Sequence, residues 1–303
     1  MEQAAFAPMT AEQAAVFRPL IDAALAEDIG SGDITTTATV DENQIADADL
    51  VFRSGGVVAG LEVVASIFHA LDAGVDVKPA VVDGERVSAG AVVATVHGSA
   101  RAILSGERTA LNLLARLSGI ATLTRAYVDA VADPAVRITD TRKTTPGLRA
   151  LERYAVRAGG GYNHRFGLAD AVLIKDNHLA ASGGIAEAVI AARRGAPEST
   201  IIEVECDSLE QVRQALESGA DAVLLDNMSV PDVRKAVALA ADSSVVEASG
   251  GITLANVKEV ASTGVDIISV GALTHGASSL DVGLDFSARP APAVVKETAS
   301  THA

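Results

Sequence analysis

From residue 136 onward, short apolar runs alternate with helical segments in a regular rhythm. The runs cover residues 136–139, 171–174, 201–204, 222–225, 245–246 and 267–270, and helices are expected at 185–194, 209–218, 231–240 and 254–263. Short runs that are apolar throughout are typical of strands buried on both faces, and a helix after each strand is the crossover of a parallel sheet. The steady spacing, with a polar residue after nearly every run, favours a TIM-type β/α barrel, complete or incomplete, over an open doubly wound sheet.

The first 130 residues follow a different pattern. Thr10 opens a capping box, from which we expect one amphipathic helix that ends at Gly30. Strands are expected at 47–52, 57–59, 75–82 and 91–97 around a helix at 61–71, which makes an α+β unit. A helical stretch at 104–131, interrupted at Gly119, is expected to bridge this unit to the barrel. The segment 287–303 is rich in Ala, Pro and Thr without periodicity, so we expect disorder there.

Charge and cysteine content exclude several classes of function. The net charge of −15 opposes binding to nucleic acid or to anionic membranes, and neither is expected as a partner. No stretch approaches the roughly 18 apolar residues of a membrane span. The single cysteine, Cys206, cannot form an internal disulfide, and the first residues lack the pattern of a signal peptide, so a cytoplasmic location is expected. Walker A and G-x-G-x-x-G patterns are absent, so ATP and NAD cofactors are not indicated.

Positive charge is concentrated in one segment of this acidic chain. Residues 137–175 contain eight Lys and Arg against three Asp and Glu, a local net charge of +5. The cations are interleaved with Thr, His and Gly rather than with aromatic residues, and His164 lies inside the segment next to Arg165. This pattern suits a pocket for a small anion with several charges better than a groove for nucleic acid. We therefore expect a carboxylate or phosphate compound as the ligand.

The residues that follow the predicted strands are polar or small. In chain order they are Arg142 and Lys143, then Lys175, Glu205, Asp226, Ser249 and Gly271. In a β/α barrel the carboxyl ends of all strands meet at one mouth, where ligands bind. A polar residue at any single strand end is explained equally well by the approach of solvent. For the whole set that explanation is weaker, because two acids and several bases would have to close buried strands independently.

Glu205 and Asp226 close consecutive predicted strands. Two carboxylates can hold Mg²⁺ when substrate phosphates supply the remaining ligands. The same two acids could instead form ion pairs with Lys175 or Arg165. The sequence does not favour one use over the other.

Two glycine-containing turns are candidates for binding a phosphate. Ser249, Gly250 and Gly251 precede the helix expected from Leu254, where backbone N–H groups could meet an anion. Gly271, with Thr274 and His275 in the next loop, would lie on the neighbouring strand and complete the cradle.

Two functions other than a phosphate-dependent transferase also fit the sequence. Lys175, at the end of an apolar run, would suit the Schiff-base lysine of a barrel aldolase. A non-catalytic sensor of anionic metabolites is a third possibility. Cys206 is expected to be a small buried hydrophobe rather than a nucleophile.

A series of motifs carries a resemblance to one known family. They are EDIGSGDITT at 27–36, ERTALN at 107–112, LSGIAT at 117–122, DTRKTTPGLR at 140–149, GGGYNHR at 159–165, IKDNH at 174–178, LDN at 225–227 and EASGG at 247–251. In this order they resemble the quinolinate phosphoribosyltransferases, the carboxylating nicotinate-nucleotide pyrophosphorylases, over nearly the whole chain. The resemblance implies an N-terminal α/β sandwich (1–117, with 278–290 returning to it), an incomplete TIM-like barrel that holds the active site (118–277) and a disordered tail (291–303). It also implies a head-to-tail homodimer with shared active sites.

The resemblance further implies a reaction and a role for each site residue. The reaction would convert quinolinate and phosphoribosyl pyrophosphate to nicotinate mononucleotide, pyrophosphate and CO₂ in NAD biosynthesis; a related transferase acting on another pyridine acid, such as nicotinate, is the alternative. Quinolinate and neighbouring phosphates would be bound by Arg142, Lys143, His164, Arg165 and Lys175, with Arg108 from the partner subunit. Mg²⁺ and the ribose hydroxyls would be held by Glu205 and Asp226, and the 5-phosphate by Ser249, Gly250, Gly251, Gly271 and His275. The catalytic residues would be Lys143, Lys175, Glu205 and Asp226, with no organic cofactor.

Overall fold

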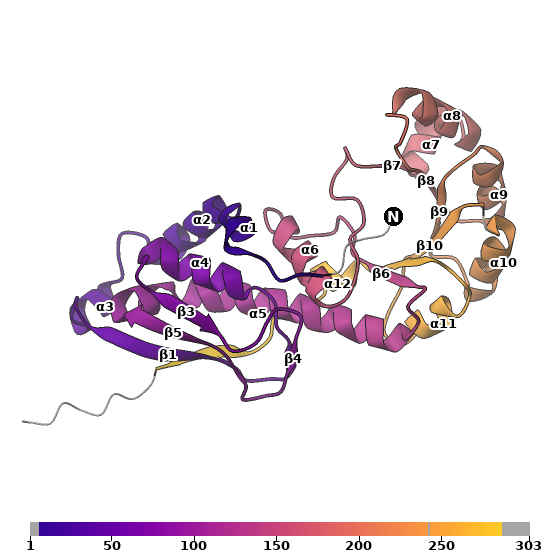
Figure 1. Cartoon of the computed structure of the whole chain (residues 1–303). Coiled ribbons are helices and arrows are strands. Elements are labelled where there is room, and N and C mark those ends of the chain that lie inside the picture. The colour runs from indigo at the N-terminus through magenta and orange to yellow at the C-terminus, as the bar shows by residue number, and fades with distance from the viewer. Residues whose placement is uncertain (1–5, 242, 287–303) are drawn as a thin grey trace, which may run out of the picture.

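Six parallel strands form the larger sheet of the protein, seen in a computed structural model that describes residues 6–241 and 243–286. The sheet order is β6-β11-β10-β9-β8-β7. The strands are β6 (Arg137–Thr139), β7 (Val172–Ile174), β8 (Ile202–Cys206), β9 (Ala222–Asp226), β10 (Val245–Ser249) and β11 (Ile267–Ser269). The sheet curls, but β6 and β7 are not paired with each other, so the barrel is incomplete (Figure 1). All six predicted strands are confirmed to within a few residues.

Helices cover the outside of the curled sheet. Between the strands lie α6 (Arg149–Ala158), α7 (Asp176–Ser182), α8 (Ile185–Gly195), α9 (Leu209–Glu217), α10 (Val230–Ala240), α11 (Val257–Ala261) and α12 (Ala272–His275). Side chains on the outer face of the strands, such as Val204, Leu225 and Ile268, are almost fully buried beneath these helices. Several residues on the inner face, such as Ala222, Leu224 and Ile267, are apolar as well, which explains why the strands read as near-continuous apolar runs in the sequence.

The second lobe is an α/β sandwich built on an antiparallel sheet. Its strand order is β12-β1-β5-β3, with a separate small pair β2-β4. The strands are β1 (Ile45–Phe52), β2 (Gly56–Val57), β3 (Asp76–Pro79), β4 (Arg86–Val87), β5 (Val92–Ser99) and β12 (Val282–Phe286). Strand β12 follows the barrel in sequence and pairs antiparallel with β1, so the chain returns to the sandwich at its end. The tail expected at 291–303 lies outside the described residues.

Helices at the start of the chain pack on the sandwich. They are α1 (Ala11–Ala15), α2 (Arg18–Ile29), α3 (Ile34–Thr39) and α4 (Leu61–Leu71). The capping box at Thr10 is present, but the expectation of one continuous helix to Gly30 is wrong, because α1 ends and α2 begins anew with Phe17 as its N-cap. Pro19 lies in the first turn of α2, where its missing N–H costs nothing, whereas inside a continuous helix it would remove a hydrogen bond and clash with the preceding turn.

One long helix, α5 (Ala100–Val131), runs from the sandwich to the barrel lobe (Figure 1). The expected interruption at Gly119 is wrong, because the helix continues through this residue. A Cβ at position 119 would lie 2.0 Å from the backbone oxygen of Ser278. Glycine is therefore required here by the close approach of the chain that leads into β12, and it does not break the helix. No helix within residues 6–241 and 243–286 combines the length and the apolarity that crossing a membrane requires.

Candidate active site

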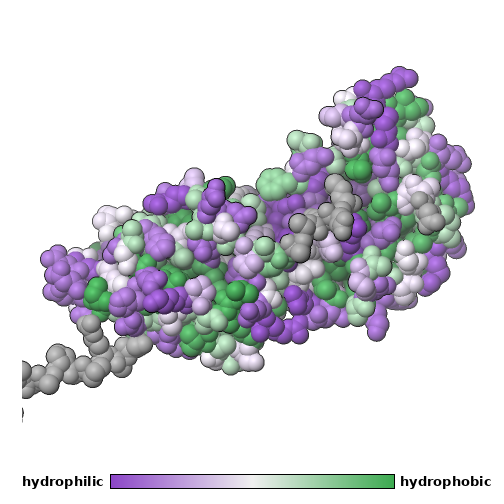
Figure 2. Space-filling model, in the orientation of Figure 1, coloured by the Kyte–Doolittle hydropathy of each residue, from purple (hydrophilic) through white to green (hydrophobic). Residues whose placement is uncertain are grey.

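The register of the barrel strands places acidic side chains on its inner face. Glu205 pairs with Leu224, Leu224 pairs with Glu247, and Asp226 pairs with Ser249. Partners in adjacent strands point to the same side of a sheet, and alternate residues of one strand do likewise. The residues between them face the helices, so Glu205, Asp226, Glu247 and Ser249 share the inner face. In Figure 2 hydrophilic residues gather in the hollow between the barrel and the sandwich.

Lys175 and Glu205 form an ion pair at the carboxyl ends of β7 and β8. Of the two uses left open for Glu205, this structure contains the ion pair with Lys175. A Schiff-base lysine must react as a free amine, so the pairing speaks against the aldolase alternative. The other candidate nucleophile, Cys206, is buried as expected, and burial raises the pKa of its thiol to about 12. Neither side chain is a free nucleophile.

Three further cations of the predicted site, Arg142, Lys143 and Arg165, lie in the segments between β6 and β7. Arg142 and Lys143 are exposed in the loop after β6, and neither has an acidic partner within ion-pair distance among the described residues. Burial lowers the pKa of Arg165, and the positive charge of Arg142 lowers it further, so the two guanidinium groups lie close enough to repel each other. Glu203 and Asp170 offset part of the charge of Arg165, so the positive charge left for a ligand with several negative charges comes mainly from Arg142 and Lys143.

The loop that carries His164 and Arg165 is held by a buried ion pair that the sequence analysis did not single out. Arg153, on α6, donates hydrogen bonds to the Asp140 carboxylate at 3.2 Å, to the His164 carbonyl at 2.7 Å and to the Arg165 carbonyl at 3.2 Å. Asp140 accepts the His164 N–H at 2.9 Å and the side-chain amide of Asn163. Burial raises the pKa of Asp140 to about 6, although Arg153 opposes the shift. The pair thus fixes the backbone that carries Arg165.

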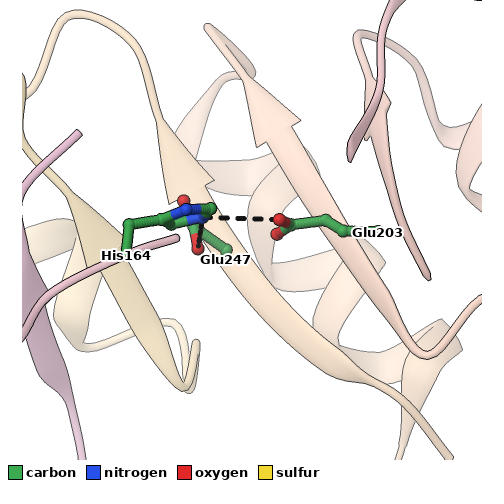
Figure 3. A group of neighbouring side chains, drawn as sticks. All are labelled: His164, Glu203 and Glu247. Atoms are coloured by element: carbon green, nitrogen blue, oxygen red, sulfur yellow. Dashed lines mark ion pairs between the residues drawn. The ribbon is translucent and has the colours of Figure 1, made fainter. Parts of the chain in front are cut away.

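His164 faces two glutamates inside the barrel (Figure 3). Its Nε2 lies 3.4 Å from Glu203 Oε2 and 3.2 Å from Glu247 Oε2, while its Nδ1 accepts the Arg165 N–H at 2.8 Å. Burial alone would lower the pKa of His164, but the two carboxylates outweigh it and raise the value to about 10. Burial and the charge of Glu247 also raise the pKa of Glu203. Because Nδ1 accepts a hydrogen bond, the ring carries its proton on Nε2, and the further proton that the raised pKa values indicate would lie on one of the two carboxyl groups.

These three side chains form a group that could hold a metal ion within the described part of the chain. A metal at Nε2 would require the proton on Nδ1, but Nδ1 accepts a hydrogen bond. Protons therefore suit the cluster better than a metal ion. Because both ring nitrogens have protein partners, His164 can bind a substrate only when one of these contacts changes, and its predicted role in substrate binding stays a prediction. The sequence signal for Glu203 was strand alternation, which places it on the same face as Glu205.

The residues expected to bind the 5-phosphate fall into two groups. In the first, a Cβ at Gly271 would lie 3.0 Å from Lys143 Cδ and 3.3 Å from His275 Nε2, so these two side chains lie against the glycine. Thr274 donates a hydrogen bond at 2.7 Å to the Lys143 carbonyl and so ties the two loops together. In the second, Ser249 lies beside Asp226, and Gly250 and Gly251 follow with φ of 82° and 61°.

The helix after this glycine turn starts later than expected. We predicted a start near Leu254, but α11 begins at Val257 and has five residues. The Asn256 side chain accepts the Thr253 N–H at 2.8 Å and donates to the Gly251 carbonyl at 3.0 Å, which forms a local turn in place of the first helical turn. The predicted helix start near residue 254 is therefore wrong. Backbone N–H groups for a phosphate would have to come from the glycine turn itself.

Arg108 belongs to the sandwich side of the molecule. It is exposed on the first part of α5, where Gly106 packs against Phe68 and Leu71 of α4. Figure 1 shows this end of α5 away from the curled sheet. Within one chain, Arg108 therefore lies on the sandwich lobe, whereas the other predicted site cations (Arg142, Lys143, Arg165 and Lys175) lie on the barrel lobe.

Comparison with known proteins identifies the family. The model for the N-terminal domain of quinolinate phosphoribosyl transferase matches residues 33–118, and that for the C-terminal domain matches residues 120–285. The chain belongs to the quinolinate phosphoribosyl transferase family.

Several relatives in the quinolinate phosphoribosyl transferase family match this chain over most of their own length. The chain is 49% identical over 261 residues to a probable nicotinate-nucleotide pyrophosphorylase [carboxylating] of Bacillus subtilis (strain 168), which covers 86% of this chain and 90% of the relative. It is 48% identical over 276 residues to the nicotinate-nucleotide pyrophosphorylase [carboxylating] of Mycobacterium leprae (strain TN), covering 89% and 96%. The crystal structure of NadC from Streptococcus pyogenes superposes with a TM-score of 0.88 at 42% identity, covering 93% of this chain and 100% of that one.

Proposed function

We propose that this protein transfers the phosphoribosyl group of phosphoribosyl pyrophosphate to the ring nitrogen of quinolinate, with loss of one carboxylate as CO₂. The products are nicotinate mononucleotide, pyrophosphate and CO₂. The observation that carries the proposal is that Arg142, Lys143 and Lys175 and the inward-facing carboxylates of Glu205 and Asp226 all lie at the carboxyl end of one parallel sheet. The family and the names of the relatives support the same reaction.

The cations suit a pyridine with two adjacent carboxylates. A guanidinium group can bind a carboxylate through two parallel hydrogen bonds, which fixes the plane of an aromatic acid as well as its position. We assign this role to Arg142 and Arg165, with Lys143 and Lys175 as further cations. Lys175 is paired with Glu205 in this structure, so substrate binding would draw its ammonium group from one carboxylate to another.

Transfer needs positioning and charge rather than a protein nucleophile. The pyridine nitrogen attacks the anomeric carbon as the bond to pyrophosphate breaks, and the ribose becomes cationic in the transition state. Glu205 and Asp226, on the inner face, would hold the ribose hydroxyls and stabilise that positive charge. The turn at Ser249, Gly250 and Gly251, with Gly271 and His275, would hold the 5-phosphate.

The same two carboxylates fit Mg²⁺. They are hard oxygen donors on one face of consecutive strands, and two carboxylates are enough when phosphate oxygens complete the coordination. When bound, the ion would neutralise the charge that develops on pyrophosphate.

Decarboxylation follows from the new bond to nitrogen. Once the ring nitrogen is quaternary, the carbon–carbon bond to the adjacent carboxylate can break, because the ring cation stabilises the electron pair left on that carbon. CO₂ leaves as this bond breaks, and the electron pair left on the ring carbon then takes up a proton from water. The cations that bound the dianion would thus bind a product with one carboxylate fewer.

We further propose a homodimer in which Arg108 completes the site of the partner subunit. Arg108 is exposed, and no acid lies within ion-pair distance of it in residues 6–241 and 243–286. Its place on the sandwich lobe suits a cation supplied to the barrel of a second copy.

The test is an assay of the purified protein with phosphoribosyl pyrophosphate and Mg²⁺, offering quinolinate and nicotinate separately as acceptors. We expect nucleotide and CO₂ in equal amounts from quinolinate, and a rate at least about a hundredfold lower from nicotinate, which leaves one cation unpaired. Faster turnover of nicotinate, or binding of quinolinate without turnover, would overturn the proposal in favour of a related transferase or of a sensor.

A further inference from the structure

Asn227 lies between the carboxylate assigned to the ribose and the turn assigned to the 5-phosphate. Its side-chain amide donates a hydrogen bond to Asp226 Oδ2 at 2.9 Å. Its backbone N–H donates to the Ser249 carbonyl at 2.9 Å, which extends the β9–β10 pairing beyond the last paired residues. One residue therefore contacts both halves of the site that would hold phosphoribosyl pyrophosphate.

The backbone of Asn227 has a conformation that few residues adopt. Its φ is 55°, in the left-handed region, which is unfavourable for most side chains and which asparagine tolerates better than others. In this conformation the side-chain amide contacts both Asp226 and the turn at Gly250.

The amide lies directly against the glycine turn. A Cβ at Gly250 would be 2.4 Å from Asn227 Oδ1 and 2.5 Å from its Cγ, so the turn and the amide fit together only because residue 250 has no side chain. A shift of the amide would therefore displace either the turn or Asp226. With Oδ2 engaged, Asp226 keeps Oδ1 for a ligand, and no donor from residues 6–241 and 243–286 contacts that oxygen.

We propose that Asn227 is a positioning residue that fixes the distance and angle between Asp226 and the turn of Ser249, Gly250 and Gly251, and so holds the ribose and the 5-phosphate in register. The proposal rests on the proposed function for its substrate. Within residues 6–241 and 243–286 no hydrogen bond joins Asn227 to the cations assigned to quinolinate, so the role concerns the sugar phosphate alone. Loss of the Asn227 amide should therefore affect the use of phosphoribosyl pyrophosphate and leave the binding of quinolinate nearly unchanged.

Two substitutions separate the amide from the backbone. Asn227→Gly keeps the left-handed φ at no steric cost but removes the amide, so the fold should be retained. Asn227→Asp keeps the shape against Gly250 but replaces the N–H donor with an acceptor beside Asp226. For both we expect kcat/KM for phosphoribosyl pyrophosphate to fall by about tenfold to a hundredfold, as for loss of a hydrogen bond to a charged group, while KM for quinolinate changes by less than about twofold. Asn43→Asp, a surface asparagine in a turn, is the matched control and should change neither constant.

Calorimetry of ribose 5-phosphate binding to the same proteins tests the role of Asn227 without requiring the proposed reaction. If the wild-type protein binds ribose 5-phosphate but does not turn over quinolinate, the proposed function fails, and at least tenfold weaker binding by both variants still supports the role of Asn227. Wild-type binding and kinetics in Asn227→Gly and Asn227→Asp would overturn it. Equal losses in KM for both substrates, or no binding of ribose 5-phosphate by the wild-type protein, would overturn it as well.

Discussion

Lys175→Ala is expected to lower kcat/KM with quinolinate by about a thousandfold or more. The substitution removes a cation from the carboxylate site and leaves Glu205 without its partner, so it weakens substrate binding and adds an uncompensated negative charge where a dianion must bind. Steady-state kinetics with both substrates measures the effect. The matched control is Lys235→Ala, which removes a lysine paired with Asp232 on the outer surface of α10 and should leave kcat/KM within about twofold.

Arg108→Ala should be similarly inactive, and mixing the two inactive proteins should recover activity. In a head-to-tail dimer, a mixed pair carries one site with both wild-type residues. With free exchange of subunits, half of the dimers are mixed, so recovery should approach about a quarter of the wild-type rate. The measurement is activity after co-refolding or co-expression, with mixed dimers quantified by two different affinity tags. Mixed dimers that form but stay inactive would contradict a site shared between subunits.

Gly119→Ala should destabilise the protein by about 3 kcal/mol, although alanine is the better helix former. Its Cβ would meet the Ser278 carbonyl oxygen at 2.0 Å, and backbone on the other side of the contact cannot rotate away as a side chain could. Relief would need a shift of the segment that hydrogen-bonds through the Leu280 N–H to the Ala115 carbonyl and then enters β12. The free energy of unfolding from denaturant titration measures the loss.

Gly195→Ala is the matched control for this substitution. Gly195 ends α8, and nothing lies within 4 Å of the position its Cβ would take. The same chemical change should therefore cost nothing there, and could add up to about 1 kcal/mol. If both variants keep wild-type stability, close packing of residues 278–279 against α5 is not what requires glycine at position 119.

Most of the barrel can be predicted from the sequence because each of its strands coincides with a short apolar run. The strands are apolar on the face beneath the helices and carry several apolar residues on the inner face as well, so they read as short apolar runs, and the helices between them read as amphipathic. The errors lie where a distant contact decides local structure. Gly119 resembles a helix break until the backbone of residue 278 is placed against it, and α11 starts late because Asn256 binds its own neighbouring backbone.

The candidate site is predictable in part for the same reason. Lys175, Glu205, Asp226 and Ser249 close strands and can be found by position alone. Glu203 and Glu247 lie within strands, where a charged residue conflicts with the expectation of a buried apolar run, and only the alternation of side chains reveals that they face the interior. In the sequence, Arg153 is a charged residue in a helical segment, where a position at the surface would be expected. Its contacts with residues 164 and 165 appear only once α6 and the following loop are folded together.

The most direct test of the account uses quinolinate labelled separately at its two carboxyl carbons. With phosphoribosyl pyrophosphate and Mg²⁺, label in CO₂ should come only from the carboxylate adjacent to the ring nitrogen, with one pyrophosphate released for each CO₂. Label released from the other carboxylate, or CO₂ formed in the absence of phosphoribosyl pyrophosphate, would contradict a mechanism in which the new bond to nitrogen permits the loss of its neighbour.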